Sequence, residues 1–141
     1  MRIGEVPNAT SRSVVTIDPS DTIADTVYVL KEYSIGAVVV SADSKKILGI
    51  ISERDVVRHL VREQEHTLRV RVEDLMTENV TTCHADDDVE ATMTVMTDGH
   101  FRHMPIVDDN GDLCGIVSLG DLAAARLEHL EAELRSTPSE S

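Results

Sequence analysis

The chain has 141 residues, a formal net charge of −13 and 41% hydrophobic residues, with no tryptophan. This acidity argues against nucleic-acid binding, which needs basic patches to displace counterions from phosphates. No apolar run approaches the roughly 18 residues needed to span a bilayer. No signal peptide is expected either, because Met1-Arg2-Ile3-Gly4-Glu5 is followed by polar residues and not by an apolar stretch. We therefore expect a cytoplasmic protein that does not bind a membrane.

The cysteines and histidines do not predict a metal site. Cys83 and Cys114 form no C-x-x-C pair and lie in apolar stretches, so they suit a reducing compartment and are expected to act as small hydrophobic residues. The histidines show no metal-ligand spacing. The acidic run Asp86-Asp87-Asp88 either holds a cation or starts a helix near Val89, and the helix dipole favours the second interpretation.

The first half of the chain predicts the element order β-α-β-β-α. It follows a polar leading segment, residues 1–13, that we expect to be loosely held. Turn and cap residues at 18–21 precede apolar residues at helical spacing. The expected elements are an extended run at 14–17, a helix from about 23 to 33, a strand at 35–40, a hairpin turn at 42–46, a strand at 47–51 and a helix at 52–63.

The second half repeats this order. Residues 14–61 align with 80–127 without a gap, and 10 of the 48 positions are identical. Its expected elements are a strand at 80–83, a helix at 89–97, a strand at 101–107, an Asn-Gly turn within 108–112, a strand at 113–117 and a helix from about 118. We therefore divide the chain into a leading segment (1–13), repeat 1 (14–64), a linker (65–79), repeat 2 (80–127) and a helical extension with a disordered tail (128–141).

The last helix carries a stripe of leucines with glutamates on its other faces. The stripe consists of Leu122, Leu127, Leu130 and Leu134. Either it packs on the core of its own chain, or the helix outruns its repeat and packs on a partner chain. Both interpretations stay open at the level of sequence.

Four of the ten identical positions lie in one short signature, Gly49 to Asp55 in repeat 1 and Gly115 to Asp121 in repeat 2. The spacing Ser-x-x-Asp matches a helix-capping box, and an acid in the first turn suits the helix dipole. Capping alone does not require the glycine. It does not require an aspartate either, since a glutamate could take its place. A strand end, a glycine and a helix N-terminus also form a corner that suits anions and hydroxyl groups. The signature is therefore read either as a cap alone or as a cap that also chelates the two hydroxyls of a ribose.

The repeated β-α-β-β-α order, with G-h-h-S/T-x-x-D closing each copy, resembles the CBS domain. The block from Phe101 to Asp108 is close to a common form of the family's second strand, and the resemblance covers roughly residues 14–127. It implies an α/β (α+β) fold in which two CBS repeats pack as one globular module with pseudo-two-fold symmetry. The resemblance also implies that an adenosine nucleotide binds in the central cleft. Within the family, the chain resembles the CBS-pair proteins that carry no catalytic domain.

The resemblance also implies which residues contact the ligand. The signature aspartates would bind ribose, a threonine in each first strand would lie near the base, and the basic residues of the second strand of repeat 2 would meet phosphate. The predicted contact residues are Thr16, Ile17, Gly36, Ala37, Val39, Ser52, Arg54, Asp55, Thr82, Arg102, His103, Met104, Pro105, Ser118 and Asp121.

The two copies differ where phosphate would bind. Repeat 1 has Gly36-Ala37 where repeat 2 has Arg102-His103, although Arg54 could partly compensate. Because charge-assisted bonds to phosphate are about twice as strong as neutral ones, we expect two unequal sites, the better one using Asp121 and Arg102. The alternatives are a surface salt bridge for Arg102 and a packed or solvent-facing side chain for His103.

Three functions are weighed. The first is a sensor that binds AMP, ADP, ATP or NAD, changes its conformation or dimer geometry, and acts on a separate, unknown effector. In the family such modules associate as homodimers. The second is a structural dimerisation module without a physiological nucleotide. An enzyme is not expected, because the sequence contains no nucleophile–base set, metal cluster or Walker loop.

Overall fold

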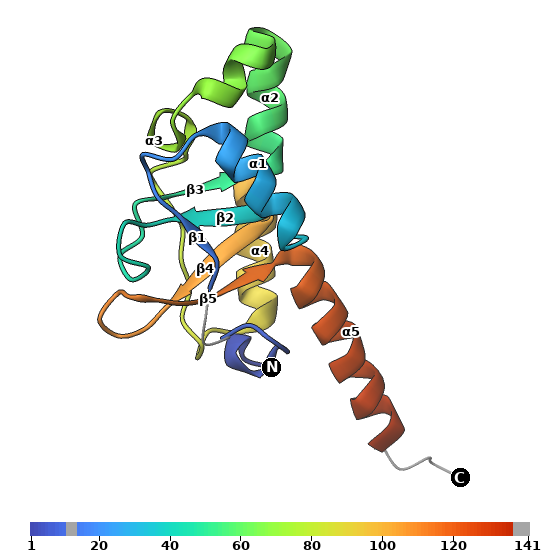
Figure 1. Ribbon diagram of the computed structural model, residues 1–141. Coiled ribbons are helices and arrows are strands. Elements are labelled where there is room, and N and C mark those ends of the chain that lie inside the picture. Colours follow the sequence, from blue (N-terminus) through green and yellow to red (C-terminus); the bar gives the residue numbers. More distant parts are fainter. Residues whose placement is uncertain (11–13, 137–141) are drawn as a thin grey trace. The chain divides into compact units, whose positions relative to one another are not determined.

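The computed structural model describes residues 1–10 and 14–136 (Figure 1), so the predicted tail at 137–141 and residues 11–13 lie outside the described part. The chain divides into two compact units. The first-repeat unit contains residues 14–81 and 111–113. The second-repeat unit contains residues 1–10, 82–110 and 114–136.

The first-repeat unit contains a three-stranded sheet of order β1-β2-β3. Strands β1 and β2 are parallel, whereas β2 and β3 form an antiparallel pair. This unit's elements are β1 (Thr16–Ile17), α1 (Ile23–Glu32), β2 (Ala37–Val40), β3 (Gly49–Ser52), α2 (Glu53–Glu63), η2 (Gln64–Arg69) and α3 (Val72–Leu75). The predicted helices and strands of repeat 1 are confirmed, and the short helices η2 and α3 within the predicted linker are additional.

Helix α1 begins where the sequence provides a cap. The hydroxyl of Thr22 accepts a hydrogen bond from the amide of Asp25 (3.2 Å), and the carboxylate of Asp25 accepts one from the amide of Thr22 (3.0 Å). This reciprocal capping box satisfies amides that the first turn leaves unpaired. The apolar face of α1 then packs on the sheet, and the core of the unit consists of Ile17, Ile23, Leu30, Val38, Val40, Ile51, Val56 and Val72.

The second-repeat unit has a two-stranded sheet of β4 and β5. Its elements are η1 (Ile3–Glu5), α4 (Val89–Gly99), β4 (His103–Val107), β5 (Leu113–Ser118) and α5 (Leu119–Ser136). The predicted strand at 80–83 is wrong except for its last residue. The amide of Val80 donates to the carbonyl of Glu78 in a turn, so pairing begins only at Cys83, which bonds to Pro105 and Val107 of β4.

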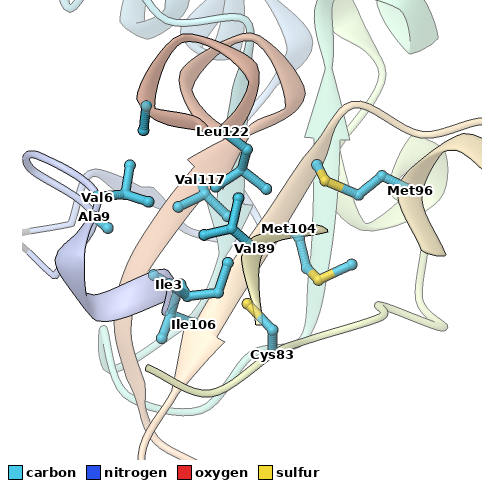
Figure 2. Close-up of a cluster of buried hydrophobic side chains, with 11 residues drawn as sticks. Ile3, Val6, Ala9, Cys83, Val89, Met96, Met104, Ile106, Val117 and Leu122 are labelled. Atoms are coloured by element: carbon cyan, nitrogen blue, oxygen red, sulfur yellow. The ribbon is translucent and has the colours of Figure 1, made fainter. Parts of the chain in front are cut away.

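The leading segment is not loosely held, which corrects the expectation for residues 1–10. Ile3, Val6 and Ala9 are buried in the core of the second-repeat unit (Figure 2). The backbone is also held, because the amide of Ile3 donates to Asp87 (2.8 Å) and the amide of Ile116 donates to Ala9 (3.2 Å). The segment that precedes repeat 1 therefore completes the core around repeat 2.

The linker packs on the last strand of the first-repeat unit, as the leading segment packs on the last strand of the second-repeat unit. Thr77 exchanges two backbone hydrogen bonds with Ile50 of β3 (2.9 and 3.0 Å), as Ala9 bonds to Ile116 of β5. The chain segment preceding each repeat thus lies against the last strand of the other repeat. This arrangement explains the signature glycines, because a Cβ on Gly49 would lie 2.6 Å from the sulfur of Met76 and 2.9 Å from the carbonyl oxygen of Thr77.

Burial makes the two cysteine thiols poor nucleophiles. Cys83 is 3% exposed, and this burial, with a smaller effect of Asp87, raises the pKa of its thiol to about 12. Only about one in 10,000 of these thiols is ionised at pH 8. We expect Cys83 to resist alkylation by iodoacetamide at pH 8 and Cys114, which is half-buried, to react first. Peptide mapping measures this, and preferential labelling of Cys83 would contradict the packing described here.

Candidate functional site

In the first-repeat unit the predicted contact residues are divided between the two faces of the sheet. Val38 and Val40 point into the core, so the alternation of side chains along a strand puts Ala37 and Val39 on the opposite face. The strand register aligns Thr16 with Val39 and Ala37 with Ser52, which therefore share that face. Ala37 and Val39 are buried on this second face. Ile17 packs in the core instead, so only its backbone could meet a ligand.

The signature of repeat 1 forms the predicted capping box at the start of α2. The hydroxyl of Ser52 accepts a hydrogen bond from the amide of Asp55 (3.3 Å), while Oδ2 of Asp55 accepts from the amide and hydroxyl of Ser52 (2.9 and 3.0 Å). Oδ1 of Asp55 accepts no hydrogen bond within residues 1–10 and 14–136. Capping thus uses one oxygen of this half-buried carboxylate and leaves the other available to a ligand.

The signature of repeat 2 forms the same arrangement at the start of α5. The amide of Asp121 donates to the hydroxyl of Ser118 (3.0 Å), and Oδ2 of Asp121 accepts from the amide of Ser118 (3.4 Å). The long second bond makes this the looser cap, and Asp121 is exposed. Its Oδ1 also accepts no hydrogen bond from a described residue.

In each repeat, the first amide of the closing helix is hydrogen-bonded to the residue at which the two repeats differ in charge, Gly36 or Arg102. The carbonyl of Gly36 accepts from the first amide of α2, that of Glu53 (2.9 Å), and the carbonyl of Arg102 accepts from the first amide of α5, that of Leu119 (2.8 Å). The fold therefore places Gly36 beside the Asp55 cap and Arg102 beside the Asp121 cap. The side chain of Arg102 is exposed and forms no ion pair with a described residue, so the salt-bridge alternative is not observed there.

The remaining predicted residues of repeat 2 follow the same alternation. Met104 packs in the core (Figure 2), so His103 and Pro105 point to the opposite face of β4. His103 is half-buried and Pro105 is buried. In repeat 1, Arg54 is exposed on the first turn of α2, one residue before Asp55.

Thr82 borders a small cavity in the second-repeat unit. The cavity has a volume of about 190 Å³ and lies between the segment 82–83, β4 and α4. Met104 and Cys83 form its buried floor, while Asp87 and Asp88 lie at its edge. Of the predicted contacts it unites only Thr82 and Met104. Sequence reasoning missed its helix residues Ala91, Thr92 and Val95, although Thr92 is identical to Thr26 in repeat 1.

Thr16 has a neighbour that the sequence did not indicate. Its hydroxyl lies 3.1 Å from the hydroxyl of Ser44. Ser44 is held in a left-handed conformation (φ 64°) by a turn in which Asp43 accepts from the amides of Lys45 and Lys46 (both 2.9 Å). These bonds, that from Lys46 foremost, lower the pKa of Asp43. The turn thus orients the side chain of the predicted base contact.

The acidic run at 86–88 starts a helix, as the helix dipole favoured. Asp88 is the N-cap of α4 and accepts from the amide of Ala91 (2.9 Å), while Asp87 accepts from the amide of His84 (2.8 Å). The described residues include no cluster of three or more acidic, histidine or cysteine side chains placed to hold a metal ion. Nor does any described helix combine the length and apolarity required to cross a bilayer.

Comparison with known proteins agrees with the repeated fold. The sequence model of the CBS domain matches residues 3–62 and 72–128. An uncharacterized protein of Methanopyrus kandleri is 36% identical over 122 residues, which are 86% of this chain and 62% of that protein, so the chain spans less than two thirds of this relative.

Two solved structures are also similar. The CBS-domain containing protein ATU1752 from Agrobacterium tumefaciens has a TM-score of 0.82 at 37% identity, covering 89% of this chain and 99% of that one. The CBS domain protein PAE2072 from Pyrobaculum aerophilum, complexed with AMP, has a TM-score of 0.80 at 26% identity, covering 93% of this chain and 97% of that one.

The fold and the paired helix caps define a tandem pair of repeats, β-α-β-β-α in the first and α-β-β-α in the second, where a single bridge at Cys83 replaces the first strand. With the sequence model matched twice, this chain belongs to the CBS-domain family.

Proposed function

We propose that this CBS pair binds an adenosine nucleotide of the AMP, ADP, ATP or NAD class and regulates a separate effector. The observation that carries the proposal is the pair of capping aspartates. Each uses one carboxylate oxygen for the cap and leaves the other without a partner among the described residues. The AMP complex of the related Pyrobaculum protein supports the ligand class.

The chemistry of the two corners fits a nucleoside phosphate. The vicinal hydroxyls of a ribose donate hydrogen bonds, and an ionised carboxylate accepts them at roughly twice the strength of a neutral acceptor. A phosphate is attracted to the N-terminus of a helix and to a guanidinium. Repeat 2 offers both, because Arg102 is bonded through its carbonyl to the first amide of α5. We therefore propose that the Asp121 site binds more tightly than the Asp55 site.

The regulatory part of the proposal rests on differential affinity. A nucleotide shifts a conformational equilibrium only by as much as it prefers one state over the other. We propose that the module works as a homodimer in the cytoplasm and passes this shift to the effector. The exposed leucines of α5 are compatible with dimerisation in both candidates, the second being a dimerisation module that needs no nucleotide.

A thermal-shift series separates the two candidates. AMP, ADP, ATP and NAD are each added at about 100 times the dissociation constant found by titration, with GTP as the control for binding through ribose and phosphate without recognition of adenine. A specific ligand should raise the free energy of unfolding by about 2.7 kcal/mol and the melting temperature by roughly 8 °C. The double variant Asp55→Ala, Asp121→Ala should lose the shift. If no adenosine nucleotide shifts the unaltered protein more than GTP does, the sensor proposal is rejected.

A further inference from the structure

A short segment of repeat 2 packs with the first-repeat unit. Residues 111–113, which lead into β5, belong to this unit. The amide of Leu113 donates to the carbonyl of Lys45 (2.8 Å), and Nζ of Lys46 lies 2.6 Å from Oδ1 of Asp112. The turn between β2 and β3 is therefore held by a backbone hydrogen bond and an ion pair from a distant part of the chain.

The ion pair joins equivalent positions of the two repeats. In the gapless alignment of 14–61 with 80–127, Lys46 aligns with Asp112. If both copies carried the same charge at this position, the two side chains would repel each other. The opposite charges make the contact attractive. The side chain of Asp112 is 28% exposed and that of Lys46 is 63% exposed, so solvent limits the strength of the pair.

The same turn holds the side chain of Thr16. We call residues 43–46 the clamped turn. The carboxylate of Asp43 accepts from two amides of the turn (both 2.9 Å), and Ser44 adopts a left-handed conformation (φ 64°) that a serine keeps only when its surroundings hold it. The hydroxyl of Ser44 then lies 3.1 Å from that of Thr16. One short segment thus links the ion pair to the predicted base contact.

Repeat 2 cannot form the same contact between hydroxyl groups. Thr82 aligns with Thr16, but Asn110 occupies the position that aligns with Ser44. A carboxamide therefore replaces the hydroxyl of the turn. The link from the turn to the threonine, through a serine hydroxyl, is a property of repeat 1.

We propose that the Lys46–Asp112 pair, acting through the clamped turn, positions Thr16 for the nucleotide of the first-repeat site. The inference rests on the proposed function, in which Thr16 lies near the base. Because the turn orients Thr16 before binding, less conformational freedom is lost when the ligand binds. The coupling is reciprocal, so a bound nucleotide also strengthens the hold of Asp112 on the turn. Lys46, Asp112 and Ser44 are thus positioning residues that act through Thr16.

Isothermal titration calorimetry with AMP tests the coupling. All chains carry Asp121→Ala, which weakens the second-repeat site, so that the titration reports mainly on the Asp55 site. Lys46→Glu should weaken AMP binding about fivefold, because it replaces an attraction with a repulsion at a partly exposed pair. Adding Asp112→Lys restores opposite charges and should return the affinity to within about twofold of the parent. If this exchanged pair binds AMP no better than Lys46→Glu alone, the proposal is overturned.

The matched control is Lys45→Glu. Lys45 is the exposed neighbour of Lys46, and its side chain forms no ion pair with a described residue. The substitution changes the net charge by the same amount, so it reproduces any long-range repulsion of the AMP phosphate, and it should alter the affinity less than about twofold. A loss as large as that of Lys46→Glu would mean that net charge sets the affinity, which contradicts the proposal.

A double-variant cycle tests the path through Ser44. Ser44→Ala removes the hydroxyl that contacts Thr16 and should weaken AMP binding about fivefold, roughly the effect of one neutral hydrogen bond. Since the path is then already cut, adding Lys46→Glu should leave the affinity within about twofold of either single variant. Additive losses would refute the path. If the unaltered chain binds no AMP, the proposed function fails and this coupling with it, whereas AMP binding that ignores both Lys46 and Ser44 rejects the coupling alone.

Discussion

Replacing Gly115 with alanine is expected to lower the free energy of unfolding by about 3 kcal/mol, at the upper end of the usual cost of overpacking. The added Cβ would overlap the carbonyl oxygen of Ala9 and lie 2.9 Å from its carbonyl carbon. A backbone carbonyl cannot rotate away as a flexible side chain can. The leading segment would have to move, which removes the Ile116–Ala9 hydrogen bond and exposes its buried residues. Urea denaturation followed by circular dichroism measures the change.

Two other glycines serve as controls for this experiment. Gly49→Ala should cost less, about 1–2 kcal/mol, because its closest contact is the flexible side chain of Met76, and the backbone oxygen of Thr77 lies at 2.9 Å rather than overlapping the added Cβ. Gly120→Ala should be neutral or slightly stabilising, since its Cβ would make only an ordinary contact and alanine favours a helix. If Gly115→Ala were as stable as Gly120→Ala, the close packing of the leading segment on β5 would be refuted.

Several residues shared by the repeats have a structural reason to be shared. Thr26 and Thr92 are buried, and each donates its hydroxyl to the carbonyl four residues earlier. Asp21 and Asp87 each accept from the amide three residues earlier. With the signature glycines needed for close approach, much of the identity between the copies follows from folding. Identity between repeats alone therefore does not identify ligand contacts.

The elements that sequence patterns predicted well are those stabilised locally. Apolar spacing and a capping residue predict α1, α2 and α4, because the relevant bonds lie within three or four residues. The leading segment was missed because its burial depends on contacts with residues about 80 to 110 positions away, such as Asp87 and Ile116. The strand predicted at 80–83 was too long. Residues of high β-propensity form a strand only where a neighbouring strand pairs with them, and in this segment only Cys83 is paired.

The same distinction holds for the candidate site, where local contacts could be predicted from the sequence and long-range contacts could not. The Ser-x-x-Asp spacing correctly predicted both capping boxes, which are local. The bonds from Gly36 and Arg102 to the helix starts follow from the strand–helix order of each repeat. The contact between Thr16 and Ser44 spans 28 residues and depends on a left-handed turn, so no local pattern indicates it. The ligand itself stays a prediction.

Asp121→Ala is expected to weaken nucleotide binding at the tighter site at least about tenfold, because a charge-assisted hydrogen bond contributes about 1.5–3 kcal/mol. Asp55→Ala should have a smaller effect, about threefold on total affinity, since Gly36 supplies no cation beside that cap. Isothermal titration calorimetry with AMP measures both. Equal losses in the two variants would refute the ranking of the sites.

Because these aspartates also cap helices, the loss of a cap must be separated from the loss of a ligand contact. Ser118→Ala and Ser52→Ala remove the hydroxyl that accepts the Asp121 or Asp55 amide while keeping the carboxylate. Each should lower the free energy of unfolding by about 1 kcal/mol and change AMP affinity less than the matching aspartate variant does. If Ser118→Ala weakened AMP binding as much as Asp121→Ala, the carboxylate would act only by ordering the start of α5. A direct bond to ribose requires the free Oδ1, and only the aspartate variant removes it.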